Sequence, residues 1–278
     1  MHLLFGITKC RKYGVNFNLN LKYTPVYINI YFGRTGTGYI DKNTIKGFMP
    51  ELYLENSRDP GEYYSDYLNT YIEKDLRQMI ALKDLNAFTR FLTLLAGRVG
   101  QVVNLSSMAG EVGVSSTTLS EWLSVLESSY VVFKLQPYFS NISKRIIKSP
   151  KVYFVEPGLA AYLLGIQNVR QVAQHPLVGN LFENMVVADR MKRLLNVGME
   201  PKLYYYRDSR QMEIDLVEEN GVDLSAYEIK SSFTANEDFT NGLNELRRMS
   251  PAVKNCSVIY SGKAVKRLQG CSFVNYED

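Results

Sequence analysis

Residues Glu213 to Ser232 have the sequence EIDLVEENGVDLSAYEIKSS. Apolar and polar residues alternate on both sides of Asn220-Gly221, a dipeptide typical of two-residue hairpin turns, so two antiparallel strands are predicted. With this turn, Glu219 would face Val222. Alternating side chains then place one polar set on a single face of the hairpin: Glu213, Asp215, Glu228 and Lys230. The opposite face would be apolar: Ile214, Leu216, Tyr227 and Ile229.

The polar face of this hairpin predicts a metal site. Three carboxylates on one face repel one another unless a cation balances them, and Asp215 and Glu228 would be diagonal neighbours able to share one ion. Oxygen donors without histidine or thiolate suit Mg²⁺ or Mn²⁺, which in such sites bind a phosphodiester and activate water. Lys230 would orient that water or stabilise charge on phosphorus. The open alternative is a solvated sheet face on which Lys230 pairs with Glu228 or Glu213 for little energy.

Elements of both kinds flank the hairpin. An amphipathic helix is predicted from about Pro176 to Leu195, and it carries Glu183 among apolar neighbours, an unusual position for a carboxylate. Strands are predicted at KLYYY, before the hairpin, and at CSVIY, Cys256–Tyr260; between the hairpin and CSVIY, residues 238–249 predict a helix. This order predicts an α/β fold of the mixed α+β type, with a mixed sheet flanked by helices.

The first 46 residues differ in pattern from the rest of the chain. Residues 15–22 alternate and residues 26–32 nearly do, which predicts a hairpin. The glycine-rich GRTGTG at residues 33–38 lacks the GK[ST] of a phosphate loop, so a turn is predicted there and no nucleotide site. From Asp59 onward the pattern becomes helical, with Asp59 as the N-cap and Pro60 at the first helical position.

Between Asn104 and Leu135 the sequence has the spacing of a helix-turn-helix. Gly113 allows the sharp turn and Ser115 can cap the second helix. The following strands, YVVFKLQPYF and KVYFV, complete a winged-helix outline around a basic loop. Four side chains of that loop could contact phosphates: Lys144, Arg145, Lys148 and Lys151. The exposed part of the second helix offers no arginine for guanine edges, so a packing scaffold and a DNA reader are equally open.

Composition restricts the class of protein. The net charge of +4 permits a nucleic-acid partner without requiring one. Three widely spaced cysteines without a CxxC pair, and only two histidines, argue against a disulfide framework or zinc ribbon, and a reducing cytoplasm is expected. No apolar run approaches the roughly 20 residues of a membrane span. The start, MHLLFGITKCRK, has its charges after the apolar part, unlike a signal peptide.

The residues also support a family resemblance. Asp215 with Glu228-Ile229-Lys230 resembles the Asp…Glu-X-Lys motif of the PD-(D/E)XK, or restriction-endonuclease-like, nucleases. Glu183 stands where the helical glutamate of their Holliday-junction-resolvase branch would be. Further matches between Gly47 and about Gly262 look like the C-terminal half of the prokaryotic AAA-type ATPases, in which a winged helix accompanies this nuclease-like fold: GFMPEL, YLNTYIEKDLRQ, KRIIKSPKVYFVEPGLAAYLLGI and HPLVGNLFENMVVADRMK among them.

The resemblance implies roles for particular residues. Glu183, Asp215 and Glu228 would bind Mg²⁺ or Mn²⁺, and Asp215, Glu228 and Lys230 would carry the chemistry. Arg207 or Asp208, at a strand end, would touch the substrate phosphate or cap the strand. The family's ATPase domain has no counterpart here, so the chain looks like a truncated or split member without nucleotide binding or ATPase activity.

The expected organisation is an atypical N-terminal segment (1–46), a helical and winged-helix domain (47–165) and a nuclease-like domain (166–278). One functional hypothesis is a metal-dependent nuclease-like DNA-processing module, a Mg²⁺-dependent deoxyribonuclease whose winged helix positions DNA. The other is a non-catalytic module that binds DNA, a protein partner or a second copy of the chain after loss of the ATPase. A degraded gene product without activity is the third. Fold alone does not choose among them.

Overall fold

The computed structural model describes residues 39–54, 58–70, 84–138 and 149–276. Several sequence predictions fall outside these ranges and are not tested by the structure. They are the hairpin within residues 15–32, the glycine-rich turn at residues 33–38, and three basic residues of the predicted wing, Lys144, Arg145 and Lys148.

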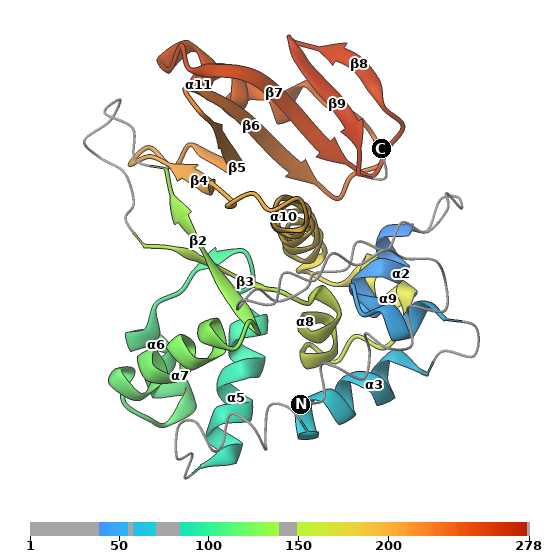
Figure 1. Cartoon of the computed structure of the whole chain (residues 1–278), viewed down its shortest axis with the longest axis vertical. Helices are drawn as coiled ribbons and strands as arrows, with labels where there is room; N and C mark the ends of the chain where they lie inside the picture. Colours follow the sequence, from blue (N-terminus) through green and yellow to red (C-terminus); the bar gives the residue numbers. More distant parts are fainter. Residues whose placement is uncertain (1–38, 55–57, 71–83, 139–148, 277–278) are drawn as a thin grey trace.

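The first part of the described chain is mainly helical (Figure 1, blue to yellow). Its helices surround one apolar core, in which Phe88 and Phe91 pack against Trp122, with ring centroids 5.2 and 6.0 Å apart. No helix in the described ranges is long and apolar enough to span a bilayer. The helices of this part are α2 (Tyr39–Lys46), η2 (Pro50–Tyr53), α3 (Pro60–Tyr67), α5 (Leu85–Ala96), α6 (Leu105–Val112), α7 (Ser116–Ser128), α8 (Pro157–Leu163) and α9 (Val169–Gln174).

Capping interactions explain where several of these helices begin and end. Asp59 caps α3 by accepting a hydrogen bond from the backbone N–H of Gly61 at 2.8 Å. Gly113 ends α6 with a φ of +85°, a left-handed conformation that glycine adopts without a steric penalty. Ser115 then caps α7 by accepting from the N–H of Thr118. The predictions for Asp59, Gly113 and Ser115 are confirmed.

Helix α2 lies within the segment that the sequence assigned to an atypical N-terminal region. Ile45 of this helix is part of the first helical core, and the hydroxyl of Tyr64 donates a hydrogen bond to the backbone oxygen of Lys46 at 2.9 Å. In Figure 1, α2 packs beside α8 and α9. The helical core therefore begins before residue 47.

Nine strands of the described residues form one mixed sheet in the order β1-β3-β2-β4-β5-β6-β7-β9-β8. Strands β2 and β4 pair in parallel, which joins the antiparallel β2–β3 pair to the C-terminal strands. The mixed α/β class predicted from sequence is confirmed. The strands are β1 (Gln101–Val102), β2 (Val132–Pro137), β3 (Lys151–Phe154), β4 (Leu203–Arg207), β5 (Glu213–Asn220), β6 (Asp223–Lys230), β7 (Val253–Tyr260), β8 (Val265–Leu268) and β9 (Cys271–Asn275).

Two helices, α10 (Val178–Asn196) and α11 (Asn241–Met249, preceded by η4, Glu237–Thr240), cover opposite faces of the C-terminal strands. Leu216 of β5 packs in one core with Phe182 of α10. Its neighbour Val217 packs in a second core with Leu243 of α11. In Figure 1, α10 lies between the sheet and the helical part of the molecule, so this helix contacts both.

The register of the β5–β6 hairpin differs from the prediction. Asn220 pairs with Asp223, so Gly221 and Val222 form the turn. The predicted turn at Asn220-Gly221 is wrong because Asn220 stays in the strand pairing and Gly221, with a φ of +68°, takes the left-handed position. The partner of each strand residue moves by two positions. An even shift keeps side chains on their faces, so the polar residues still lie close together.

Candidate functional site

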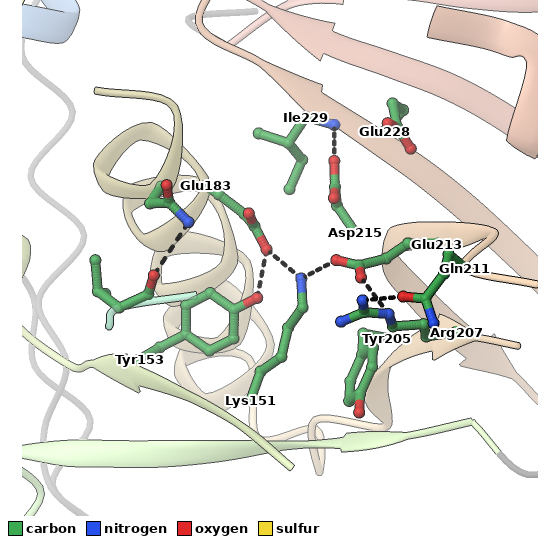
Figure 2. A network of polar contacts seen from close by, with 12 residues as sticks. Lys151, Tyr153, Glu183, Tyr205, Arg207, Gln211, Glu213, Asp215, Glu228 and Ile229 are labelled. Carbon is green, nitrogen blue, oxygen red and sulfur yellow. Dashed lines mark hydrogen bonds and ion pairs between the residues drawn. The ribbon is translucent and has the colours of Figure 1, made fainter. Parts of the chain in front are cut away.

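The polar residues singled out from the sequence meet where β5 and β6 approach α10 and β3 (Figure 2). We call Glu183 of α10, Glu213 and Asp215 of β5, and Glu228 of β6 the acid cluster. Two lysines neutralise it: Lys230 of β6 and Lys151 of β3. The structure therefore brings together the three predicted metal ligands and the predicted catalytic lysine, and adds a lysine from a distant part of the sequence.

Lys151 is the centre of the buried side of this site. Its Nζ lies 3.0 Å from Oε1 of Glu183 and 2.6 Å from Oε1 of Glu213, and it lies 5.4 Å from the ring centroid of Tyr205. Its side chain is only 3% exposed. The two carboxylates outweigh the effect of burial and raise the pKa of Lys151. The sequence prediction that Lys151 contacts phosphates is wrong, because its ammonium points into the protein.

Glu183 is held from two sides. Its Oε1 accepts hydrogen bonds from Nζ of Lys151 and, at 2.5 Å, from the hydroxyl of Tyr153. Burial, and then the charge of Asp215, raises the pKa of Glu183 to about 7. Tyr153 is itself fully buried and has a raised pKa, chiefly from burial, so it stays a hydrogen-bond donor. With a pKa of about 7, the protonated and ionised forms of Glu183 are therefore similarly populated near neutral pH.

Asp215 sits at an irregular point of β5. Val217 pairs with Tyr204 of β4, and Ile214 pairs with Tyr206. Between these two pairs β5 advances three residues while β4 advances two, which is a β-bulge. The bulge moves Ile214 into the core beside α11, whereas Leu216 packs beside α10, so the prediction that these two share a face is wrong. Asp215 accepts a hydrogen bond from the backbone N–H of Ile229 at 2.8 Å. This bond fixes Asp215 beside β6.

Glu228 and Lys230 form the more open side of the site. Nζ of Lys230 lies 2.5 Å from Oε1 of Glu228 and 3.4 Å from Oδ2 of Asp215. Burial, and then the charge of Asp215, raises the pKa of Glu228 to about 8. Its other oxygen, Oε2, is buried and has no hydrogen-bond partner within the described part of the chain. Lys230 is 34% exposed, so it can leave its carboxylates for solvent.

Arg207 borders the site at the end of β4. Its Nε lies 3.3 Å from Oε2 of Glu213, and it also donates a hydrogen bond to Gln211. Asp208 accepts two backbone hydrogen bonds, from the N–H of Arg210 at 2.8 Å and from the N–H of Met212 at 3.0 Å. Asp208 therefore caps the turn after β4. Arg207, which is partly exposed, remains the member of this pair that can reach a ligand.

The donor chemistry of the acid cluster suits a hard divalent cation, since every candidate ligand atom is a carboxylate oxygen. The unpartnered buried oxygen of Glu228 supports that fit. Within the described ranges, however, no group of three or more His, Cys, Asp or Glu side chains is placed to hold a metal ion. Lys151 and Lys230 instead neutralise the carboxylates. A metal ion at Asp215 and Glu228 would therefore have to replace Lys230.

Sequence reasoning missed two contributors, Lys151 as an internal cation and Tyr153 as a donor to Glu183. A signal was present in KVYF, because residues two apart in a strand share a face, and a lysine and a tyrosine share a face of an otherwise apolar strand. The sequence did not show that both side chains contact Glu183. Glu183 lies 30 residues beyond Tyr153, on a helix.

Comparison with known proteins divides the chain into two regions. Residues 38–170 match a family described as a domain of unknown function (DUF8612), and residues 178–277 match a second domain of unknown function (DUF4143). The boundary between the two matches falls just before α10. Lys151 and Tyr153 therefore lie in the first matched region, and the acid cluster lies in the second.

Three curated relatives share part of this sequence. Uncharacterized proteins of Mycobacterium tuberculosis and Mycobacterium bovis are each 30% identical over 200 residues, which is 72% of this chain and 44% of theirs. An uncharacterized protein of Haemophilus influenzae is 22% identical over 158 residues, which is 55% of this chain and 38% of the relative. The chain thus spans less than half the length of these relatives. No solved structure matches it.

Proposed function

We propose that this chain is a metal-dependent, nuclease-like DNA-processing module. The observation that carries the proposal is the meeting of Glu183, Asp215, Glu228 and Lys230, from one helix and two strands, in one partly buried site. Their types and order resemble the Asp…Glu-X-Lys motif of the PD-(D/E)XK nucleases, together with the helical glutamate of their Holliday-junction-resolvase branch. The chain's substrate would be a DNA phosphodiester.

The protonation of the site supports a metal ligand role. Glu183 and Glu228 have pKa values of about 7 and about 8, so close carboxylates here share protons instead of all being ionised. A divalent cation favours the ionised form of its ligands and would release those protons on binding. The ligands would be Glu183, Asp215 and Glu228, with Mg²⁺ or Mn²⁺ as the suitable ions. The bound ion would supply Lewis-acid activation of the phosphodiester and of a water molecule.

The remaining polar residues would act on the substrate. Lys230 is charged, its pKa being raised by Asp215 and Glu228 despite burial. Once displaced from these carboxylates, its ammonium could donate hydrogen bonds to the attacking water or to the phosphate. Arg207 is partly exposed beside Glu213 and could hold a neighbouring phosphate. These residues would position the substrate and stabilise negative charge at phosphorus.

DNA binding would involve the first part of the chain. The order α5-β1-α6-α7-β2-β3 supports a winged-helix interpretation, with α7 as the second helix of the helix-turn-helix. The basic loop between β2 and β3, with Lys144, Arg145 and Lys148, would contact the DNA backbone. A cytoplasmic location would suit a DNA-processing protein with free thiols at Cys256 and Cys271.

A second function is favoured by one observation. Lys151 and Lys230 between them pair with all four carboxylates of the acid cluster, as would be expected of a fold that is kept after catalysis is lost. The chain would then be a non-catalytic module that binds DNA or a protein partner, including a second copy of itself. Salt-dependent DNA binding without cleavage would identify this function.

Calorimetric titration with Mn²⁺ and Mg²⁺ tests the first proposal. The wild-type chain is expected to bind a divalent ion, and Asp215→Asn combined with Glu228→Gln should abolish the heat. Glu219→Gln is the matched control and should bind like wild type. Glu219 belongs to the same hairpin but pairs with Lys202, outside the acid cluster. Equal, weak heats from all three proteins would favour the non-catalytic function. Cleavage of plasmid DNA in the presence of Mn²⁺ then separates an active site from a metal-stabilised one.

A further inference from the structure

The two lysines of the site are bound in different ways. Lys151 contacts Glu183 and Glu213 and lies under the ring of Tyr205, with its side chain 3% exposed. Lys230 contacts two carboxylates as well, but its side chain is 34% exposed. A lysine with a solvent route can move aside for an incoming ion. A lysine enclosed by carboxylates and an aromatic ring cannot do so without leaving the buried carboxylate of Glu183 without its cation.

The contacts of Lys151 also divide the acid cluster. Glu213 gives one oxygen to Lys151 and the other to Arg207, so both of its oxygens face a cation of the protein. Glu183 uses the single atom Oε1 for both Lys151 and Tyr153, which leaves Oε2 as the oxygen it can offer elsewhere. Of the four carboxylates, Glu213 is therefore the one with a different cationic side chain of the protein beside each oxygen.

The ammonium of Lys151 lies between two carboxylates, which is where a metal ion bridged by those carboxylates would lie. Nζ of Lys151 lies within 3.0 Å of one oxygen from each of Glu183 and Glu213. Many phosphodiester-cleaving sites hold two metal ions about 3.5–4 Å apart, with carboxylates on both. Here the position between Glu183 and Glu213 is filled by an ammonium group that belongs to the chain.

We propose that Lys151 is a built-in counter-ion that fills one of two cation positions, so that the site takes a single divalent ion, at the position of Lys230. Lys151 is then a positioning residue: it fixes Glu183 and withdraws Glu213 from metal binding. The count of one ion rests on the proposed function. The occupancy of the Glu183–Glu213 position by Lys151 does not.

The site combines residues from both matched regions. Lys151 belongs to the region of residues 38–170, and the acids it neutralises belong to the region of residues 178–277. The second region on its own would carry the acid cluster without its buried cation. Strand β2 pairs with β3 and, in parallel, with β4, and this arrangement carries Lys151 to the acids. The two regions would thus form one site.

Isothermal titration with Mn²⁺ alone, on the full chain, tests this proposal. Wild type is expected to bind about one ion per chain, because Lys151 occupies the other position. Lys151→Met should add a second binding event, and Lys151→Met combined with Glu213→Gln should lose that event again. Lys151→Arg keeps the charge and should bind like wild type. Lys134→Met removes a lysine of the neighbouring strand β2, which pairs with Glu127 of α7, and it should change nothing.

The outcomes separate this proposal from the proposed function. Absence of binding by wild type would overturn the metal-dependent function, and a new event in Lys151→Met that Glu213→Gln removes would still support the role of Lys151. A folded Lys151→Met protein that gains no event would overturn that role. Where Lys151→Met does not fold, Lys151→Gln takes its place, because its amide can still donate to Glu183 while the positive charge is gone; the same two results then decide.

Discussion

Helix α10 contributes to two buried charge clusters that differ in composition: one pairs opposite charges, and the other gathers several carboxylates. Near its start, Glu183 belongs to the acid cluster. Near its end, Lys192 faces Glu156, the residue that precedes α8, at 3.7 Å, and lies 4.2 Å from the ring centroid of Phe48. Glu156 also accepts hydrogen bonds from the backbone N–H of Phe48 at 2.6 Å and from the hydroxyl of Tyr64 at 3.1 Å. We call this set the Glu156 cluster.

The Glu156 cluster pairs one anion with one cation and satisfies the carboxylate with two further donors. Such a cluster ties the start of α8 to α10, to α3 and to the segment that follows α2. In the acid cluster, like charges gather, and Oε2 of Glu228 lacks a partner among the described residues. The first arrangement limits the cost of burying charge, whereas the second raises that cost and retains affinity for an external cation. The difference distinguishes a structural site from a candidate functional one.

The largest effect is expected from breaking the Glu156 cluster. Glu156→Ala removes a buried carboxylate that pairs with Lys192 and accepts two hydrogen bonds, so it should lower the free energy of unfolding by about 3–5 kcal/mol, measured by urea denaturation. Glu127→Ala removes one side of an exposed pair with Lys134 and should cost at most about 1 kcal/mol. Mn²⁺ heats at a temperature where the variant is folded should be unchanged. A loss as small as that of Glu127→Ala would place the two clusters in the same class.

The second effect is a pH dependence that belongs to the acid cluster. The pKa of Glu228 is raised from 4.5 to about 8 in the folded chain. The folded state therefore binds this proton more tightly than the unfolded state does, and protonation of Glu228 stabilises the fold. The stability it contributes is fully present below about pH 4.5 and is lost as the pH rises through about 8. Glu228→Gln, which stays neutral, should therefore gain stability relative to wild type between about pH 5.5 and about pH 8.5.

Urea denaturation at the two pH values measures this effect. Glu245→Gln, an exposed acid that pairs with Arg210, is the control and should keep a constant difference from wild type. Saturating Mn²⁺ should remove the advantage of Glu228→Gln, because the ion stabilises the ionised carboxylate. A difference between wild type and Glu228→Gln that does not change with pH would contradict the raised pKa.

Local sequence signals predicted much of the fold. Caps and turns depend on a few neighbouring residues, which is why Asp59, Gly113 and Ser115 could be assigned from sequence. The hairpin was predicted in the right place, but its turn was centred one residue early. The Asn-Gly preference assumes positive φ at both turn positions, whereas the chain needs it only at Gly221.

The candidate site was predictable only in part. The motif residues Asp215, Glu228 and Lys230 lie in one hairpin, and an even register error left them together. Lys151 depends on the parallel pairing of β2 with β4, a long-range contact between residues that are 68 positions apart in the sequence. No periodicity within β3 encodes that contact. Charge balance in the site was therefore the part that sequence reasoning could not supply.

The smallest change in stability is expected at the most central acid. Asp215→Asn should alter the free energy of unfolding by less than about 1 kcal/mol in metal-free buffer, because the amide oxygen of asparagine can still accept the hydrogen bond from Ile229. The substitution also removes the charge that raises the pKa values of Glu183 and Glu228, which offsets the loss of attraction to Lys230.

Urea denaturation and Mn²⁺ titration of the same Asp215→Asn sample give the sharpest contrast with the Glu156 cluster. A structural carboxylate is expected to matter for stability and not for metal binding, and a functional one is expected to do the reverse. A loss of several kcal/mol would instead assign Asp215 a structural role like that of Glu156. Near-wild-type stability with abolished Mn²⁺ heat would show that the acids are held together for their ligand, because the fold does not need this charge.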